Sequence, residues 1–246
     1  MQLDDILYAQ GFGSRRACAG LIETGAVEVQ DATGDWQLAK VDDYPAQGLR
    51  LRVAGEEWEC HAKAYLMLHK PAGMECSHKP SLHPSVFDLL PAPLRMRPNK
   101  GGALGVQAVG RLDQDTSGLL LLSDDGQFVH RMSSPKKHVP KVYEVTTKHP
   151  LSETQVQQLL AGVVLNDDTA PVKAAAAERV SAHHLRLTLS EGKYHQVKRM
   201  VAAVSNRVER LHRSHIGGLK LPDDLLPGQW RFLSEQELLM VQYRSV

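Results

Sequence analysis

Apolar and polar residues follow two different spacings along this chain, and these spacings predict where helices and strands lie. Near the start, Leu3, Ile6 and Leu7 fall on one helical face. The glycines at 11 and 13 end that helix, and Ser14 is a favourable N-cap for a second helix. Residues 26–29, with the sequence AVEV, alternate like a short strand. The beginning of the chain therefore predicts two short helices followed by strands.

Further strands and helices are predicted in the rest of the chain. Residues 65–68 and the leucine run 119–122 predict buried strands, and the alternation over 185–189 predicts a strand with one buried face. Ser152 and Gln155 have the spacing of a capping box at the start of a helix. Strands outnumber helices and most are not joined by regular crossover helices. This order favours an α+β fold over a doubly wound one.

The composition is that of a globular protein with a sizeable core. The chain has 246 residues, of which 42% are hydrophobic, enough for one or two domains. No apolar run approaches the roughly 20 residues of a membrane helix. The start, MQLDDILYAQ, lacks the basic residues and apolar stretch of a signal peptide. We therefore expect a cytoplasmic protein with no membrane partner.

The cysteines and histidines do not form a recognisable metal or disulfide pattern. Cys18, Cys60 and Cys76 are odd in number and include no CxxC pair, which argues against a disulfide framework and a thiolate zinc site. His78 and His83 follow Cys76 in a proline-rich loop without helical HxxxH spacing. We expect no bound metal.

The charge is distributed unevenly, although the net charge is only +1. Residues 1–60 carry 5 Lys and Arg against 11 Asp and Glu, whereas residues 61–246 carry 24 against 17 and all 12 histidines. A basic surface on the larger part fits a polyanionic partner such as nucleic acid, and fits a solvated surface equally well. The polar stretch from 53 to 63 is interpreted as a linker between domains 1–60 and 61–246.

The stretch from 106 to 126, VQAVGRLDQDTSGLLLLSDDG, carries the clearest chemical signal. A short strand ends at Val109, and Gly110 opens a loop that displays Asp113 before the buried leucine strand begins. A single Asp at such a corner is more often a turn former than a catalytic residue. The length of the complete motif favours the catalytic interpretation of Asp113 over the turn-forming one.

The motif GRLDxxTSGLLLLxxDG closely resembles the catalytic signature of the RsuA/RluA pseudouridine synthases. Three further stretches resemble motifs of that family in the same order: KPAG at 70–73, KVYEV at 141–145 and EGKYHQVKRM at 191–200. The resemblance implies isomerisation of uridine in RNA to pseudouridine without a cofactor. It also implies a bent, mainly antiparallel mixed β-sheet with flanking helices and a cleft across its middle.

The beginning of the chain resembles an S4 RNA-binding domain. The resemblance rests on Leu3-Asp4, on Ser14-Arg15-Arg16, on Leu21-Ile22 and on the alternation after Gly25. The chain departs from the S4 pattern at Gln2 and Asp5, where basic residues are usual, and in the longer turn 30–34. With the acidic balance of residues 1–60, these departures leave open a docking module whose arginines are only surface charges.

Within the family, the S4-like start and the YHQVKRM form of the last motif look most like the RsuA branch, which acts on 16S rRNA of the small subunit. Three alternatives remain open: a synthase acting on 23S rRNA, a non-catalytic ribosome-assembly factor and an Asp-dependent sugar hydrolase. The assembly factor would leave the Asp113 loop unexplained. The hydrolase would need a second carboxylate as general acid, and Asp115 is poorly suited to that role.

The resemblance assigns roles to particular residues. Asp113 is the expected catalytic carboxylate, because a carboxylate near C1′ can stabilise or attack a sugar with oxocarbenium character. Lys198 is expected beside it, since a cation keeps a carboxylate ionised in an apolar pocket. Tyr143 is expected to stack on the extracted uracil, although a strand tyrosine commonly serves core packing. Covalent and glycal mechanisms both remain open.

Basic residues are expected to contact RNA, with Arg111 beside the flipped nucleotide. The other expected contacts are Lys70, Arg15, Arg16, Lys141, Arg199 and Arg213. The expected partner is ribosomal RNA, either alone or within an assembling small subunit, and the expected oligomeric state is a monomer.

Overall fold

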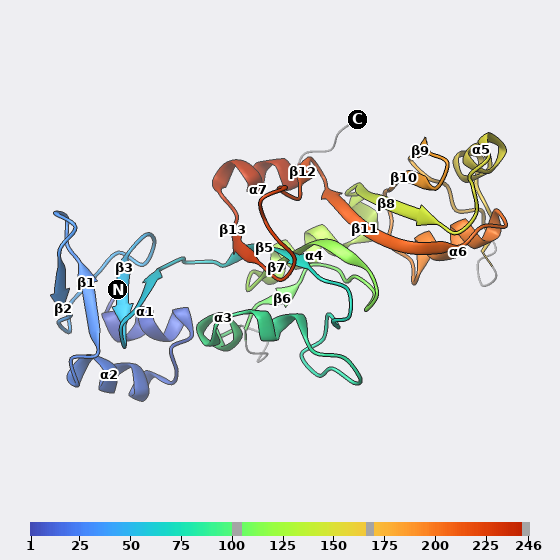
Figure 1. The fold of residues 1–246 in the computed structure, drawn as a ribbon. Coiled ribbons are helices and arrows are strands. Elements are labelled where there is room, and N and C mark those ends of the chain that lie inside the picture. The colour runs from blue at the N-terminus through green and yellow to red at the C-terminus, as the bar shows by residue number, and fades with distance from the viewer. Residues whose placement is uncertain (100–104, 166–169, 243–246) are drawn as a thin grey trace. The chain divides into compact units, whose positions relative to one another are not determined.

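The computed structural model describes residues 1–99, 105–165 and 170–242 (Figure 1). The chain divides into two compact units, each described by itself below. Unit 1 comprises residues 1–65, 90–107 and 122–126. Unit 2 comprises residues 66–89, 108–121 and 127–246.

Most of the helices and strands are labelled in Figure 1. Within the described residues the α-helices are α1 Leu3–Gln10, α2 Arg15–Glu23, α3 Ala92–Met96, α4 Gly126–Ser133, α5 Glu153–Ala161, α6 Gln196–Ala203 and α7 Glu235–Gln242. The strands there are β1 Val27–Gln30, β2 Trp36–Leu38, β3 Arg50–Val53, β4 Glu56–Glu59, β5 Tyr65–Lys70, β6 Gln107–Ala108, β7 Ser117–Ser123, β8 Lys141–Thr147, β9 Ala176–Ser181, β10 His184–Leu189, β11 Val208–Ile216, β12 Leu219–Lys220 and β13 Trp230–Phe232.

The two helices at the start of unit 1 are formed as the sequence predicts. Leu3, Ile6 and Leu7 of α1 are fully buried, in one cluster with Cys18 of α2. The Ser14 side chain accepts a hydrogen bond from the backbone N–H of Ala17 and so caps the start of α2. The predicted helix boundaries and the buried face of α1 are therefore confirmed.

The predicted linker over residues 53–63 is wrong, because residues 56–59 within it form strand β4. In the four-stranded sheet, with strand order β2-β1-β3-β4, β3 and β4 form a hairpin that pairs Val53 with Glu56. Ala54 and Gly55 make the two-residue turn, both with positive φ (50° and 88°), as a type I′ turn requires. The glutamates looked like linker residues, but β4 is an edge strand on which exposed charges are favourable.

Unit 1 extends beyond residue 60 because a buried arginine ties later segments to its start. Arg97 is 1% exposed, and its Nε donates to Asp124 Oδ2 at 2.7 Å. Its Nη1 donates to Gln10 Oε1 at 2.9 Å and its Nη2 to the His61 carbonyl at 2.7 Å. The compact unit is thus larger than the predicted module 1–60, whose separate RNA-binding role stays a prediction.

Unit 2 is built around a mainly antiparallel sheet. The strand order is β13-β5-β7-β11-β8-β10-β9, with β12 added to β11 and β6 to β7. The pair β7–β11 is parallel, whereas β13–β5, β11–β8, β8–β10 and β10–β9 are antiparallel. The predicted α+β class is therefore confirmed.

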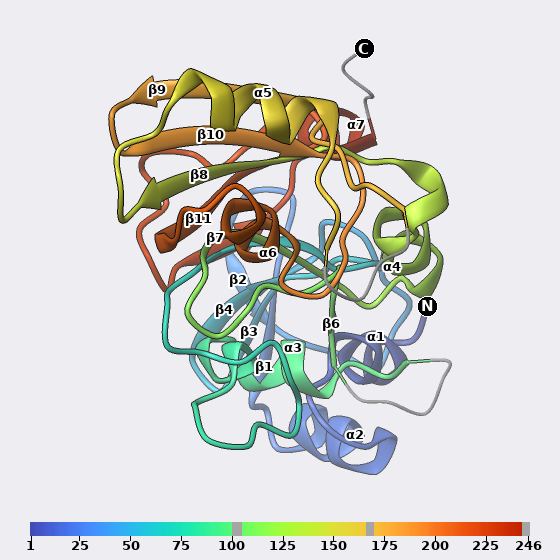
Figure 2. The same ribbon diagram turned by 90° about the vertical axis from the view of Figure 1, so that its right-hand side faces the viewer.

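Helices cover the outer strands of this sheet and complete its core. Figure 2 shows α5 running alongside β9 and β10. Val156 and Leu159 of α5 lie in one buried cluster with Leu185 and Leu187 of β10. The predicted capping box at Ser152 is confirmed, since its hydroxyl and the Gln155 side chain bind each other's backbone N–H. Over the described ranges, no helix is both long and apolar enough to cross a bilayer.

Candidate active site

The motif containing Asp113 forms a loop between β6 and β7, and we call residues 110–116 the Asp113 loop. Gly110 begins it with φ +69°, and the backbone N–H of Thr116 donates to the Asp113 carbonyl at 3.1 Å. Gly118 follows, and a Cβ added there would lie 2.3 Å from the backbone oxygen of Arg213 on β11. Glycine is therefore needed where β7 and β11 approach each other.

The motif at 70–73 forms hydrogen bonds with the Asp113 loop. Lys70 is fully buried, and its ammonium donates to the carbonyls of Pro71, Gln114 and Thr116 at 3.0, 3.1 and 2.8 Å. The Gly73 N–H also donates to the Gln114 carbonyl at 2.9 Å. Burial lowers the pKa of Lys70, an effect that nearby Cys76 and the loop carboxylates oppose.

The expectation that Lys70 contacts RNA therefore needs correction. A side chain with no exposed surface, whose three N–H groups meet three carbonyls, cannot reach a phosphate in this conformation. The geometry assigns Lys70 to positioning the Asp113 loop. Because lysine is nearly always on the surface, no local pattern indicated that Lys70 would be buried.

Replacing Lys70 with Met should therefore destabilise the protein. The change removes three hydrogen bonds, including the buried one to the Thr116 carbonyl, and we expect a loss of about 3 kcal/mol in the free energy of unfolding. Urea denaturation measures it, with the exposed Lys136→Met as the matched control. A loss no larger than that of the control would contradict the positioning role.

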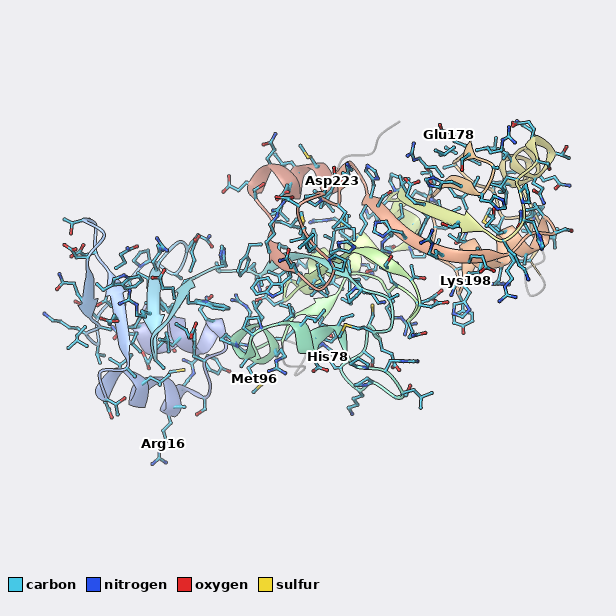
Figure 3. The ribbon with its side chains drawn as sticks, in the orientation of Figure 1. Arg16, His78, Met96, Glu178, Lys198 and Asp223 are labelled. Atoms are coloured by element: carbon cyan, nitrogen blue, oxygen red, sulfur yellow. The ribbon has the colours of Figure 1, made fainter. Side chains whose placement is uncertain are left out.

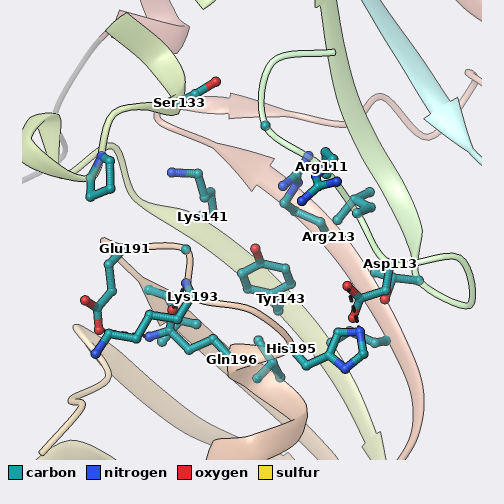
Figure 4. A pocket seen from close by; sticks show the side chains of 18 of the residues that line it. Arg111, Asp113, Ser133, Lys141, Tyr143, Glu191, Lys193, His195, Gln196 and Arg213 are labelled. Carbon is teal, nitrogen blue, oxygen red and sulfur yellow. Dashed lines mark hydrogen bonds and ion pairs between the residues drawn. The ribbon is translucent and has the colours of Figure 1, made fainter. Parts of the chain in front are cut away.

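Asp113 lies between two basic side chains from the start of α6. Its Oδ2 is 3.2 Å from Lys198 Nζ and its Oδ1 is 3.5 Å from His195 Nε2. The second contact, an ion pair when His195 is protonated, is the dashed line in Figure 4. The structure thus brings Asp113 and Lys198 together, and adds His195, which the sequence had not singled out. The three-residue spacing of His195 and Lys198 was the only available signal.

Lys198 also binds a second carboxylate. Its ammonium donates to Asp115 Oδ1 at 2.6 Å. Burial raises the pKa of Asp115, but the hydrogen bond and the charge of Lys198 outweigh it, so the pKa is lowered. Burial likewise lowers the pKa of Lys198, and the two carboxylates outweigh it, so that pKa is raised. Lys198 therefore stays charged and keeps Asp115 ionised.

A cavity of about 150 Å³ opens beside Asp113 on one face of the sheet. Tyr143 and Lys141 of β8 line it, because alternate residues of a strand share a face. The register pairs Tyr143 with Arg213 of β11, which lines the same cavity. Figure 4 shows the Tyr143 ring between Lys141 on one side and Asp113 on the other. The expected tyrosine and carboxylate therefore meet in one pocket.

The remaining basic residues fall into different environments. Arg111 is exposed and lines the cavity, whereas Arg213 is 2% exposed and donates from Nε to the Leu119 carbonyl at 2.9 Å. Lys141 donates to the Val139 carbonyl at 2.8 Å; burial, aided by the charge of Arg213, lowers its pKa to about 8. Arg199 donates to the Tyr194 carbonyl at 3.2 Å and lies outside the cavity lining.

Arg15 and Arg16 belong to α2 in unit 1. Both are exposed, and Figure 3 shows Arg16 projecting outward from the helix. Arg15 forms an ion pair with Asp5 and lies over the Tyr8 ring, 4.5 Å from its centroid. In the part of the chain that the structure describes, no three His, Cys, Asp or Glu side chains cluster in a way that could hold a metal ion.

Comparison with known proteins assigns this fold and pocket to a family. A sequence model described as RNA pseudouridylate synthase matches residues 64–203. The chain belongs to this family. It is 46% identical to ribosomal small subunit pseudouridine synthase A of Yersinia pestis over 177 residues, 72% of each chain. It is 37% identical to the protein of that name from Pasteurella multocida, covering 97% of this chain and 98% of the relative.

A solved structure supports the same family membership over the whole chain. The crystal structure of a pseudouridylate synthase has a TM-score of 0.67 and 32% sequence identity, with 98% of this chain and 99% of that chain covered. The resemblance to RsuA-type pseudouridine synthases is thereby confirmed. The family match begins at residue 64, so it does not test the S4-like interpretation of the first 60 residues.

Proposed function

We propose that this pseudouridine synthase isomerises a uridine of ribosomal RNA, and that its substrate is the 16S rRNA of the small subunit. The observation that carries the proposal is the Asp113 carboxylate, 3.2 Å from the Lys198 ammonium, beside the cavity that contains Tyr143. The likeness to a protein named ribosomal small subunit pseudouridine synthase A, over 97% of this chain, supports the choice of RNA.

The reaction exchanges one bond of uridine for another. The N1–C1′ bond breaks, the uracil rotates, C5 joins C1′, and a proton leaves C5 while N1 gains one. Asp113 attacks C1′ or removes a 2′ proton, and the Lys198 ammonium pairs with its carboxylate at 3.2 Å. Tyr143 supplies the aromatic surface that replaces the lost neighbouring bases. The reaction is redox-neutral and transfers no group to a second molecule, so these side chains suffice without a cofactor.

RNA contacts are proposed for basic residues of both units. Arg111, exposed at the cavity, meets the backbone beside the flipped nucleotide. Lys141 and Arg213 line the cavity and so contact the nucleotide inside it. Arg199 and the exposed Arg15 and Arg16 contact the backbone, the latter two from an S4-like module at residues 1–60, with 61–246 as the catalytic domain. We propose a monomer that acts in the cytoplasm, where ribosomes assemble.

Tritium release from RNA labelled at uridine C5 tests the function directly. We expect the wild-type protein to release tritium from 16S transcripts or assembling small subunits and not from 23S transcripts. Mapping pseudouridine by a chemical stop should then give a single position. Release from 23S RNA alone would contradict the proposed substrate, and release from neither RNA would contradict the enzymatic proposal.

A further inference from the structure

A second cavity, of about 470 Å³, adjoins the first one across the Asp113 loop. Gly110–Asp113 lines both cavities, as do Gly192, Lys193 and His195. Residues 75–77 and Tyr194 line only the second cavity of the two. A ribose that meets Asp113 therefore lies at a wall common to the two cavities. The proposed mechanism uses only the first cavity.

Tyr194 stands out at this second cavity because it is a large aromatic side chain with 74% of its surface exposed. Its ring stacks on His195, with centroids 3.8 Å apart and planes 19° from parallel. The Arg199 guanidinium holds the Tyr194 carbonyl, and His195 has φ +47° as the N-cap of α6. An exposed ring in a fixed backbone provides a flat stacking surface at little entropic cost.

The charges around this cavity suit a nucleotide. Arg111, exposed, can pair with a phosphate, while an aromatic ring accepts any base by stacking. Glu75, the acidic residue of the facing segment, is already engaged: the backbone N–H groups of 81–83 and the Ser81 hydroxyl bind its carboxylate. Its carboxylate oxygens are therefore already occupied by four hydrogen-bond donors.

We infer that the second cavity binds a nucleotide next to the isomerised uridine in the RNA chain, with its base stacked on Tyr194. The inference rests on the proposed function, because Asp113 must then meet the ribose of the target uridine. Asp113 lines both cavities, so a ribose that meets Asp113 would place one of its phosphodiesters at the wall that the cavities share. The adjoining nucleotide is thus led towards Tyr194.

This subsite restricts the substrate. A base stacked on Tyr194 cannot remain stacked in an RNA helix, so the target uridine needs an unpaired neighbour as well as being unpaired itself. Because stacking accepts every base, the requirement concerns the presence of a base and not its identity. The enzyme should therefore tolerate base changes at the neighbouring position and should not tolerate the loss of the base.

The test combines variants of the protein with abasic substrates. RNA carrying an abasic nucleotide 5′ or 3′ of the target uridine is compared with ordinary RNA in the tritium assay. Tyr194→Ala should raise KM about tenfold on ordinary RNA, the loss expected for one stacked base. One of the two abasic substrates should raise KM of the wild type similarly. The two changes together should cost no more than either alone, because both remove the same contact.

Two control variants make the outcome specific. Tyr194→Phe should retain the wild-type KM, because stacking needs the ring and not the hydroxyl. Leu226→Ala removes another large exposed apolar side chain, at a different cavity, and should have no effect. An unchanged KM for Tyr194→Ala, or losses that multiply on the abasic substrate, would overturn the subsite while leaving the proposed function intact. A wild type that releases no tritium from any RNA would overturn the function itself.

Discussion

Asp113→Asn should abolish tritium release from C5-labelled RNA. We expect kcat to fall by about 10⁴-fold or more, as in other enzymes that lose a side chain taking part directly in the reaction. The amide has the size of the carboxylate but no negative charge. It can neither stabilise a cationic sugar nor act as nucleophile or base. RNA affinity should stay near the wild-type value, since the change removes no cation.

Asp115→Asn is the matched control for this variant. Asp115 is also a carboxylate held by Lys198, but it is 61% exposed on its side chain and does not line the cavity. We expect its activity to fall by less than about tenfold, as for the loss of one exposed ion pair. Activity retained in Asp113→Asn and lost in Asp115→Asn would mean that the catalytic carboxylate has been wrongly assigned.

Lys198→Ala should lower kcat by roughly 10²–10³-fold, the usual cost of removing one group that holds charge in an active site. Lys198 is the cation 3.2 Å from Asp113 and 2.6 Å from Asp115. Without it both carboxylates lose the cation that they share, and the negative charge of Asp115 is no longer stabilised by it. The kcat of the purified variant on saturating RNA measures the effect.

A second variant distinguishes an electrostatic role of Lys198 from a role in packing. Lys198→Arg keeps the cation and should recover most of the lost activity, whereas a structural role would be lost in both variants. Lys220→Ala breaks an exposed ion pair with Asp223 and should leave kcat unchanged. Equal loss in the Ala and Arg variants, with thermal unfolding unaltered, would contradict the electrostatic role.

Much of the fold could be predicted from the sequence, because the signals involved are local. The N-cap at Ser14, the capping box at Ser152 and the alternation in β10 depend on residues within a few positions of one another. The hairpin turn at Ala54-Gly55 was also local, but the glutamates around it gave the composition of a linker, and the edge strand was missed.

The candidate site was predictable in part. The motif around Asp113 pointed to the carboxylate, and family resemblance pointed to Tyr143 and Lys198. The contact of His195 with Asp113 was not predicted, because it depends on how the segment before α6 turns towards the Asp113 loop, 82 residues away in the chain. Lys70 was misjudged for the same reason, since its carbonyl partners at 114 and 116 follow it by more than forty residues.

The sequence by itself therefore indicated α1, α2 and α5, several of the strands, the family and the proposed catalytic carboxylate, all of which depend on short-range patterns or on a continuous motif. Only the tertiary structure decided which basic side chains reach that carboxylate, which one is buried beneath its loop, and that two cavities meet beside it. These outcomes depend on packing between strands and loops far apart in the chain, where the energy of each contact is set by neighbours that no local pattern specifies.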